Sequence, residues 1–472
     1  MMTAWYTPQF GGVRMTAKSI AYAEELIGEL REHFECIPEH RGPQTTIPLQ
    51  DALMSAYAMF SLKFPSLLEF EDERKEGGTK ESNLKTIFQI GQIPSDTQMR
   101  SIVDEIDPAR LKNIFPAFLR WIQHKKLLKA YEFFSHKGCE YYLTSVDGTG
   151  FFSSNEIQCD ACLTRKSSKT DMVTFHHQML TAAIIHPHLK TVIPLAPEAI
   201  IRQDGATKND CEMNALKRWV QSFRKDHPQL KIILNLDGLY GNNKIVSLLR
   251  GAQIPFIIVV SDSLQTGLFD YVNGAETRGN ITQFEWQERF GNKVEKTKTC
   301  RFRLKSDCPL NGQENTEWVS FFEYWEEIIW TDSKGRAQRE EYHCSWITDL
   351  NCKTEKQAKR LVEGARSRWK IENETHNTLK TQGYNLEHSY GHGESHLAEN
   401  FILLMLLSFL VDQVQLMGCR FFTRLVELIK RKTRIWERIR NMYCMFQLKS
   451  WTQLLTVIIQ AYSGAGLILD SS

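Results

Sequence analysis

Three acidic residues follow elements that a folded sheet would bring together. Asp147 follows the β-rich run YYLTSV, Asp237 follows the apolar run KIILNL, and Glu372 lies in a helical stretch at 355–382. Divalent cations prefer carboxylate oxygens, and two such ions roughly 3.5–4 Å apart can hold the attacking and leaving oxygens of a phosphodiester in line. The three residues therefore predict metal-dependent phosphoryl transfer. Taken alone, each aspartate also fits a turn, because Asp-Gly is a common turn dipeptide.

The helical stretch ARSRWKIENETHNTLKTQGYNLEH offers two glutamates. Arg368, Glu372 and His376 share one face at about 100° per residue, with Lys380 nearby. Glu374 points roughly 200° away from Glu372, so Glu372 is the predicted ligand. Arg368 can hold its carboxylate, and Lys380 can meet a phosphate. The alternative is a solvated helix face with ion pairs four residues apart.

The elements around these residues follow the order of a ribonuclease-H-like core. Unbroken apolar runs between helices indicate a buried parallel sheet. We expect an α/β fold with a mixed five-stranded sheet: strands at 141–146, 173–186 and 189–195, a helix from Asn209 to about Asp226, a strand at 231–236, a helix at 243–250 and a strand at 254–260. We interpret Lys208, Asn209, Asp210 and Glu212 as the start of the first helix, with Glu212 completing a capping box, in preference to a catalytic contribution.

No helix is expected directly after the last of these strands. Residues 275–350 alternate apolar and polar positions with many aromatic residues, which indicates a β-rich insertion. We predict five segments: a helical N-terminal region (1–135), the first part of the catalytic core (136–265), the β-rich insertion (266–352), the last part of the core with the glutamate helix (353–412) and a basic helical C-terminal region (413–472).

The charge balance excludes a uniformly basic nucleic-acid binder. The 472 residues include 58 Lys and Arg against 56 Asp and Glu, a net charge of +2. The balance is −2 over 1–135, −2 over 136–412 and +6 over 413–472. Residues 420–451 of this tail mix Arg and Lys with aromatic residues at helical spacing, which fits either binding to the DNA backbone or a solvated helix face.

Neither a secretory signal nor a membrane span is expected. The longest apolar stretch, Phe401 to Val411, is too short to cross a bilayer and is predicted to be a core helix. The 11 cysteines are mostly scattered singly, which fits a reducing compartment, and we expect a cytoplasmic protein. Cys159 and Cys162 have metal-ligand spacing, with His176 and His177 downstream; a structural zinc site and a tight turn with free thiols are both open interpretations.

Three segments resemble a known family. They are SVDGTGFFSS with Asp147, ILNLDGLYGN with Asp237, and RSRWKIENETHNTLK with Arg368, Glu372 and Lys380. The chain is similar to bacterial insertion-sequence transposases with an Asp-Asp-Glu triad, in the branch that carries a β-rich insertion before the glutamate helix. HHQMLTAAIIHP, PLAPEAIIRQDGATKNDCEMNA and EHSYGHGESHLAEN extend the resemblance over about residues 90–450.

The chain departs from that family pattern at two positions. The branch usually places Tyr three residues before the motif arginine, where this chain has Ala365. Its lysine usually follows the glutamate after six intervening residues, whereas seven separate Glu372 from Lys380 here.

The resemblance implies a Mg²⁺-dependent recombinase. Asp147, Asp237 and Glu372 would bind two Mg²⁺ ions, which Mn²⁺ can replace, and Arg368 and Lys380 would contact DNA. By the same analogy, the helical N-terminal region (1–135) would be the DNA-binding region that reads sequence. Such an enzyme pairs two transposon ends as a homodimer in a synaptic complex, nicks double-stranded DNA and joins it to target DNA, in the bacterial cytoplasm with the nucleoid. Two alternatives stay open: a ribonuclease-H-like nuclease without strand transfer, and a domesticated copy that binds DNA without catalysis.

Overall fold

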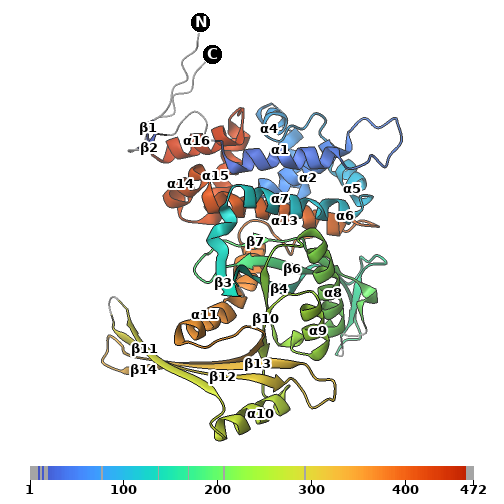
Figure 1. Ribbon diagram of the computed structural model, residues 1–472. Coiled ribbons are helices and arrows are strands. Elements are labelled where there is room, and N and C mark those ends of the chain that lie inside the picture. The colour runs from blue at the N-terminus through green and yellow to red at the C-terminus, as the bar shows by residue number, and fades with distance from the viewer. Residues whose placement is uncertain are drawn as a thin grey trace. The chain divides into compact units, whose positions relative to one another are not determined.

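The computed structural model describes residues 9–10, 13–14, 20–75, 78–136, 138–167, 169–205, 208–291 and 294–463. The chain divides into two compact units (Figure 1). The helical unit comprises Met1–Leu127, Ile157–Cys159 and Thr378–Ser472, and the sheet unit comprises Leu128–Glu156 and Asp160–Asn377. The predicted N-terminal and C-terminal helical regions thus belong largely to one unit. The other holds the predicted insertion and most of the predicted core, whose last part (353–412) is divided between the units after Asn377.

The central strand of the sheet unit is β4 (Cys139–Ser154). It pairs antiparallel with β6 (Val173–Ile185) on one side and parallel with β9 (Ile232–Leu236) on the other. Beyond β9 lies the parallel strand β10 (Phe256–Val260). The short strands β7 (Ile193–Pro194) and β8 (Glu198–Ile200) pair antiparallel with β6.

Two helices connect the parallel strands. They are α8 (Lys208–Asp226), between β8 and β9, and α9 (Asn243–Gly251), between β9 and β10. The predicted helices and the last two predicted strands are present. The structure adds β3 (Glu132–His136) before β4 and β5 (Leu163–Lys166) between β4 and β6, and of the predicted strand at 189–195 only Ile193–Pro194 forms, as β7. Every residue of β9 is buried, as expected for a strand inside a parallel sheet. In Figure 1, α8 and α9 lie on one side of these strands and α11 (Glu355–Arg366) lies on the other.

The insertion is a four-stranded antiparallel meander that continues the same sheet (Figure 1). Its strands are β11 (Thr282–Phe290), β12 (Lys296–Pro309), β13 (Trp318–Thr331) and β14 (Ala337–Thr348). Because β14 pairs with β10, the described residues form a sheet of twelve strands, and the predicted five-stranded sheet is wrong in extent. The aromatic residues noted in the sequence stack across these strands, as Phe302 does on Phe322 and Phe322 on Trp346.

A helix precedes this meander, against the prediction. α10 (Thr266–Thr277) follows β10 after a short loop and contacts β12. Its apolar residues Leu268, Phe269, Val272 and Ala275 recur at helical spacing and are buried. The sequence interpretation missed it because the aromatic alternation that begins near residue 275 dominated the pattern.

The helical unit is built around α13 (Leu397–Gly418). This helix is long and apolar enough to cross a membrane, but 83% of its apolar window is buried inside the protein, as a core helix requires. Other helices in this unit are α1 (Tyr22–Glu35), α2 (Leu49–Ser61), α3 (Leu67–Lys75), α4 (Thr79–Ile87), α5 (Asp96–Asp104), α6 (Pro108–Lys112), α7 (Ile114–His124), α14 (Arg420–Ile429), α15 (Lys432–Met445) and α16 (Trp451–Tyr462).

Two local predictions for this unit have opposite outcomes. The run Pro94-Ser95-Asp96 predicts a helix start, and Ser95 does cap α5, where it forms a capping box with Gln98. The charged, glycine-containing run EFEDERKEGGTKES predicts a loop at 69–82. That prediction is wrong for most of the segment, because α3 runs through Lys75 and α4 begins at Thr79. Buried Leu67 and Phe70 anchor α3.

Candidate active site

Asp147 lies inside a strand rather than in a turn. β4 continues to Ser154, and Asp147 pairs with Thr181 of β6. The parallel pairing of β4 with β9 ends at Ser145. Asp147 therefore stands at the carboxyl end of the parallel pair, where α/β sheets bind ligands, although its strand runs on beside β6.

Asp237 directly follows β9, as predicted. Its Oδ1 accepts a hydrogen bond of 3.0 Å from the backbone N–H of Leu239, so the carboxylate caps the 3₁₀ turn Gly238–Tyr240. Two residues earlier, the Nδ2 of buried Asn235 donates to the carbonyls of Gly364 (2.7 Å) and Ala365 (3.2 Å). The strand that carries Asp237 is thereby tied to the end of α11.

Glu372 lies in a helical segment that changes its winding. After α11, residues Ser367–Trp369 form a 3₁₀ turn, Ile371–His376 a π-helix, and Asn377–Thr381 an α-helix. The predicted helix over 355–382 is therefore nearly continuous, but the assumed 100° per residue does not hold throughout. π-turns accommodate an extra residue in a helix and are frequent at functional sites.

Asp147, Asp237, Arg368 and Glu372 interact electrostatically. Burial, together with the negative charges of Asp237 and Glu372, raises the pKa of Asp147 to about 6, against the opposing positive charge of Arg368. Arg368 Nη2 lies 2.7 Å from Glu372 Oε1 and holds that carboxylate, as predicted. Glu374 instead interacts with Lys370. Of the two glutamates, Glu372 is thus the one whose charge acts on Asp147.

Two residues contact Asp147: His376 of the π-helix lies near its carboxylate, and Thr181 of β6 bonds to its backbone carbonyl. His376 Nδ1 lies 3.7 Å from Asp147 Oδ2, and its Nε2 lies 2.7 Å from the Thr181 hydroxyl. That hydroxyl donates to the Asp147 carbonyl at 3.2 Å. The sequence placed His376 on the face of Glu372 but gave it no role, and the register that brings Thr181 opposite Asp147 joins residues far apart in the chain.

Lys380 lies in the helical unit, where its Nζ pairs with Glu387 at 2.9 Å. Because part of the segment between Glu372 and Lys380 is a π-turn, these two residues are not spaced as in a regular α-helix.

The side chains present fit divalent cations. Asp147, Asp237 and Glu372 offer the hard oxygen ligands that Mg²⁺ prefers, without a competing His and Cys cage among them. Their mutual repulsion, seen in the raised pKa of Asp147, is what a bound cation would relieve. These three residues would hold the metal.

The predicted zinc ligands lie apart from the three carboxylates in the sequence. Cys162 is buried, and its Sγ lies 3.3 Å from Nε2 of His177 on β6. Cys159, three residues earlier in the chain, is half-buried. The interpretation as a tight turn with free thiols gives no role to an imidazole nitrogen this close to the Cys162 thiol. Two ligands of one zinc ion would lie at such a distance.

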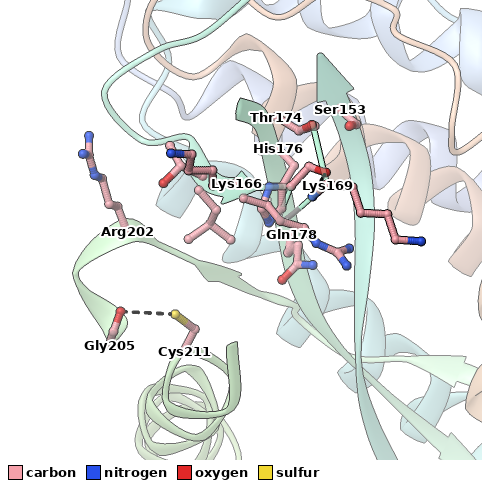
Figure 2. A pocket seen from close by; sticks show the side chains of 13 residues that line it. Ser153, Lys166, Lys169, Thr174, His176, Gln178, Arg202, Gly205 and Cys211 are labelled. Atoms are coloured by element: carbon pink, nitrogen blue, oxygen red, sulfur yellow. Dashed lines mark hydrogen bonds between the residues drawn. The ribbon is translucent and has the colours of Figure 1, made fainter. Parts of the chain in front are cut away.

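A basic pocket lies in the sheet unit beside β6 and the start of α8 (Figure 2). It has a volume of about 1130 Å³. Its lining includes Arg165, Lys166, Lys169 and Arg202, and none of the described residues that line it is acidic. Cys211, one residue before Glu212, donates to the carbonyl of Gly205 at 3.7 Å on its wall. Sequence reasoning missed this pocket because three separate segments form it.

The comparisons with known proteins find a distant structural likeness. No protein-family model matches this chain, and no curated protein sequence matches it. Among solved structures, it aligns with a cryo-EM structure of a piggyBac transposase synaptic complex with hairpin DNA. The alignment covers 95% of this chain and 81% of that chain, at 9% sequence identity and a TM-score of 0.38. The function is therefore inferred from the site.

Proposed function

We propose that this protein is a DNA transposase with an Asp-Asp-Glu triad formed by Asp147, Asp237 and Glu372. One observation carries the proposal: Asp147 stands where the parallel pairing of β4 with β9 ends, Asp237 directly follows β9, and the charges of Asp237 and Glu372 both act on Asp147. The strand order β7/β8–β6–β4–β9–β10, with α8 and α9 as connections, supports a ribonuclease-H-like core. In such a core this position serves metal-dependent phosphoryl transfer.

The catalytic step would need positioning and charge stabilisation more than a nucleophilic side chain. When bound, two Mg²⁺ ions, or Mn²⁺ in their place, would supply positive charge at the reacting phosphate. The protein's part is to hold the ligands: Arg368 fixes Glu372, while His376 and Thr181 fix Asp147. Water would cut DNA at the element's ends, and the liberated 3′-hydroxyl would attack target DNA.

Basic groups would bind the DNA backbone at more than one place. In the sheet unit, the pocket with Lys166, Lys169 and Arg202 lies beside the strands that carry the site. Arg368 and Lys380 remain proposed DNA contacts. In the helical unit, apolar and aromatic residues of α14 and α15 are buried, whereas Arg420, Arg431 and Arg434 are exposed, as a phosphate-binding surface requires. The active form would be a cytoplasmic homodimer that pairs two DNA ends.

Strand cleavage and strand transfer test the proposal. The full chain is incubated with Mg²⁺ and the DNA that flanks its own gene, and nicks at repeat boundaries and joined products are mapped. Asp147→Ala, Asp237→Ala and Glu372→Ala should each abolish both products while DNA binding persists. Glu374→Ala, two residues from Glu372 on the same helical segment, is the matched control and should keep activity.

Each other outcome selects an alternative. Nicks without joined product would identify a nuclease that does not transfer strands. DNA binding without nicks by the wild-type chain would identify a non-catalytic copy. Near-full cleavage by one of the three alanine variants would remove that residue from the triad.

A further inference from the structure

Glu326 of the insertion forms an ion pair with the end of the helix that precedes Glu372. It lies on β13 and is only 7% exposed. Its Oε2 lies 2.6 Å from Nη1 of Arg366, the last residue of α11, and accepts a hydrogen bond of 2.7 Å from the Tyr324 hydroxyl. Because burying an unpaired charge is costly, the Glu326 carboxylate holds Arg366 in place.

The Arg366 guanidinium also packs on two aromatic rings of the insertion. Its Cζ lies 4.2 Å from the ring centroid of Tyr342 on β14 and 5.9 Å from that of Tyr324 on β13. Burial opposes the charged form, but the charge of Glu326 and its hydrogen bond outweigh this effect and raise the pKa of Arg366. Two strands of the insertion thus fix the end of α11, which lies beside them in Figure 1.

This contact lies next to the candidate active site along the chain. Arg366 directly precedes the 3₁₀ turn, and Arg368 in that turn lies 2.7 Å from Glu372. The positive charge of Arg368 acts on the Cys344 thiol of β14 as well as on Asp147. The insertion therefore meets the glutamate segment at the arginine pair that leads to Glu372.

The place of the contact matters because the winding of the chain changes there. A 3₁₀ turn and a π-helix rotate successive side chains by angles that differ from those of an α-helix. A shift of Arg366 would therefore redirect both Arg368 and Glu372. Asn235 of β9 fixes the backbone carbonyls just before this point, and Glu326 fixes the side chain that follows them.

We propose that Glu326 and Arg366 are positioning residues, through which the β-rich insertion sets the orientation of Glu372 in the metal site. The inference rests on the proposed function, because the orientation of Glu372 matters here through its role as a metal ligand. The insertion then contributes to catalysis by supporting a ligand, as the hydrogen-bonded partners of metal ligands do in other proteins.

Mn²⁺ binding and DNA cleavage by the full chain test this assignment together. Free Mn²⁺ is measured by electron paramagnetic resonance, and cleavage rates are measured over a range of DNA concentrations. Glu326→Gln keeps the shape of the side chain and removes its charge. It should weaken Mn²⁺ binding, and lower the cleavage rate at saturating DNA, by about 10–100-fold. The half-saturating DNA concentration should stay unchanged, because the proposed DNA contacts are intact.

Glu327→Gln is the matched control. Glu327 is the next residue of β13, so its side chain points to the opposite face of the sheet, where it pairs with Arg339 at 2.5 Å. This variant also loses one carboxylate and one ion pair of the insertion. It should bind Mn²⁺ and cleave DNA like the wild type.

A structural role alone predicts a different result. Glu326→Gln would then unfold at a lower temperature while its folded fraction bound Mn²⁺ and cleaved DNA like the wild type, and only this inference would be wrong. A wild type that neither binds Mn²⁺ nor cleaves DNA would overturn the proposed function as well.

Should Glu326→Gln not fold, Arg366→Lys decides. The lysine keeps a positive charge near Glu326 but loses the planar guanidinium that packs on Tyr342. Mn²⁺ affinity should again fall, and an unchanged affinity would contradict the assignment.

Discussion

Asp147 illustrates how one residue can serve a site at the expense of stability. The carboxyl is largely buried and lies near Asp237 and Glu372, so that its pKa rises to about 6. At neutral pH the folded protein holds a charge that the unfolded chain would accommodate more easily. A bound cation would remove much of this penalty.

Asp147→Asn should therefore stabilise the metal-free protein at neutral pH. The folded pKa of about 6 lies above the ordinary 3.8, so the folded state binds more protons between these values, and stability decreases as pH rises through them. The gain of the variant over the wild type should be near zero below pH about 4 and approach about 3 kcal/mol above pH about 7. Thermal unfolding of both proteins across pH, without metal, measures it.

The sign of that pH dependence is the decisive result. Asp226→Asn, on the surface end of α8, should show no such pH-dependent gain and serves as the control. A gain that grows toward acid pH would contradict the raised pKa of Asp147. Added Mg²⁺ should reduce the advantage of Asp147→Asn, because only the wild type keeps all its ligands.

Cys162 and His177 lead to a prediction about zinc content. If the thiolate and the imidazole at 3.3 Å bind zinc with Cys159, the protein purified under reducing conditions should contain about one zinc ion per chain. Cys162→Ser should lose it and unfold at a lower temperature. Cys36→Ser, at an exposed cysteine, should keep the metal. Elemental analysis of both variants distinguishes this site from a pair of free thiols.

The sequence predicts residues whose positions follow from a local pattern of strand or helix. It does not predict residues that strand pairing brings close together. Asp237 and Glu372 could be predicted because an apolar strand and an amphipathic helix precede or contain them. Thr181 could not, because only the pairing of β4 with β6 brings it to Asp147.

At the scale of elements, the glutamate segment is fixed at its start. Asn235 of β9 donates to the carbonyls of Gly364 and Ala365 as α11 ends, and the Ser367 hydroxyl donates to the same Gly364 carbonyl at 2.6 Å. The 3₁₀ turn and π-helix follow from this anchored point. Asn235 thus sets where Glu372 stands relative to the strand that leads to Asp237.

Asn235→Ala should reduce catalysis without touching a metal ligand. Removing the amide leaves two carbonyls short of a donor and should destabilise the sheet unit by about 1–3 kcal/mol. Because Glu372 is then less well positioned, strand cleavage should fall more than DNA binding does. Gel-shift and cleavage assays on the same preparation test this, with Asn243→Ala on α9 as the control for loss of an amide. Equal loss of binding and cleavage would indicate general unfolding instead.

The basic pocket leads to a prediction about salt dependence. Lys169→Glu should weaken binding to DNA of any sequence, and the slope of log affinity against log salt should become shallower by about 1, because one phosphate contact is lost. Lys225→Glu, an exposed lysine near the end of α8, should have a smaller effect. An unchanged slope for Lys169→Glu would exclude this pocket from the DNA path.

The fold was predictable where strands and helices alternate along the chain. The joining of the insertion to the core strands in one sheet was not. Apolar runs and turn signals predicted α8, α9 and the strands β4, β6, β9 and β10, whereas the short strands at Leu163–Lys166 and Glu198–Ile200 were missed. The pairing of β14 with β10 was not predictable, since residues 345–348 meet residues 257–260 only through the return of the whole insertion. α10 was hidden by the start of the aromatic alternation.

At the scale of the whole molecule, one buried ion pair joins the two ends of the chain within the helical unit. Lys63 Nζ lies 2.7 Å from Asp412 Oδ2, with side chains 0% and 3% exposed. The ammonium also donates to the Phe60 carbonyl and to Ser408, and Tyr384 donates to Asp412 at 2.6 Å. Nearly all hydrogen-bonding capacity of the pair is used inside the core.

Lys63→Met should destabilise the helical unit by about 3–5 kcal/mol, because it leaves Asp412 charged and unpaired in the core. Lys63→Met with Asp412→Asn should recover part of this loss, since no buried charge remains. Urea unfolding followed by helical circular dichroism compares the variants. A double variant less stable than the single one would show that the carboxylate is needed for reasons other than its lysine.

The Lys63–Asp412 ion pair can form only late in the synthesis of the chain. Asp412 follows Lys63 by 349 residues. At ribosomal speeds of about 5–20 residues per second, the N-terminal helices wait on the order of 20–70 s for the partner that completes their core. The whole sheet unit emerges in that interval and can fold before the helical unit closes. A nascent or truncated chain thus carries the carboxylates before it has a finished helical unit, so chaperone demand should concentrate on the N-terminal helices.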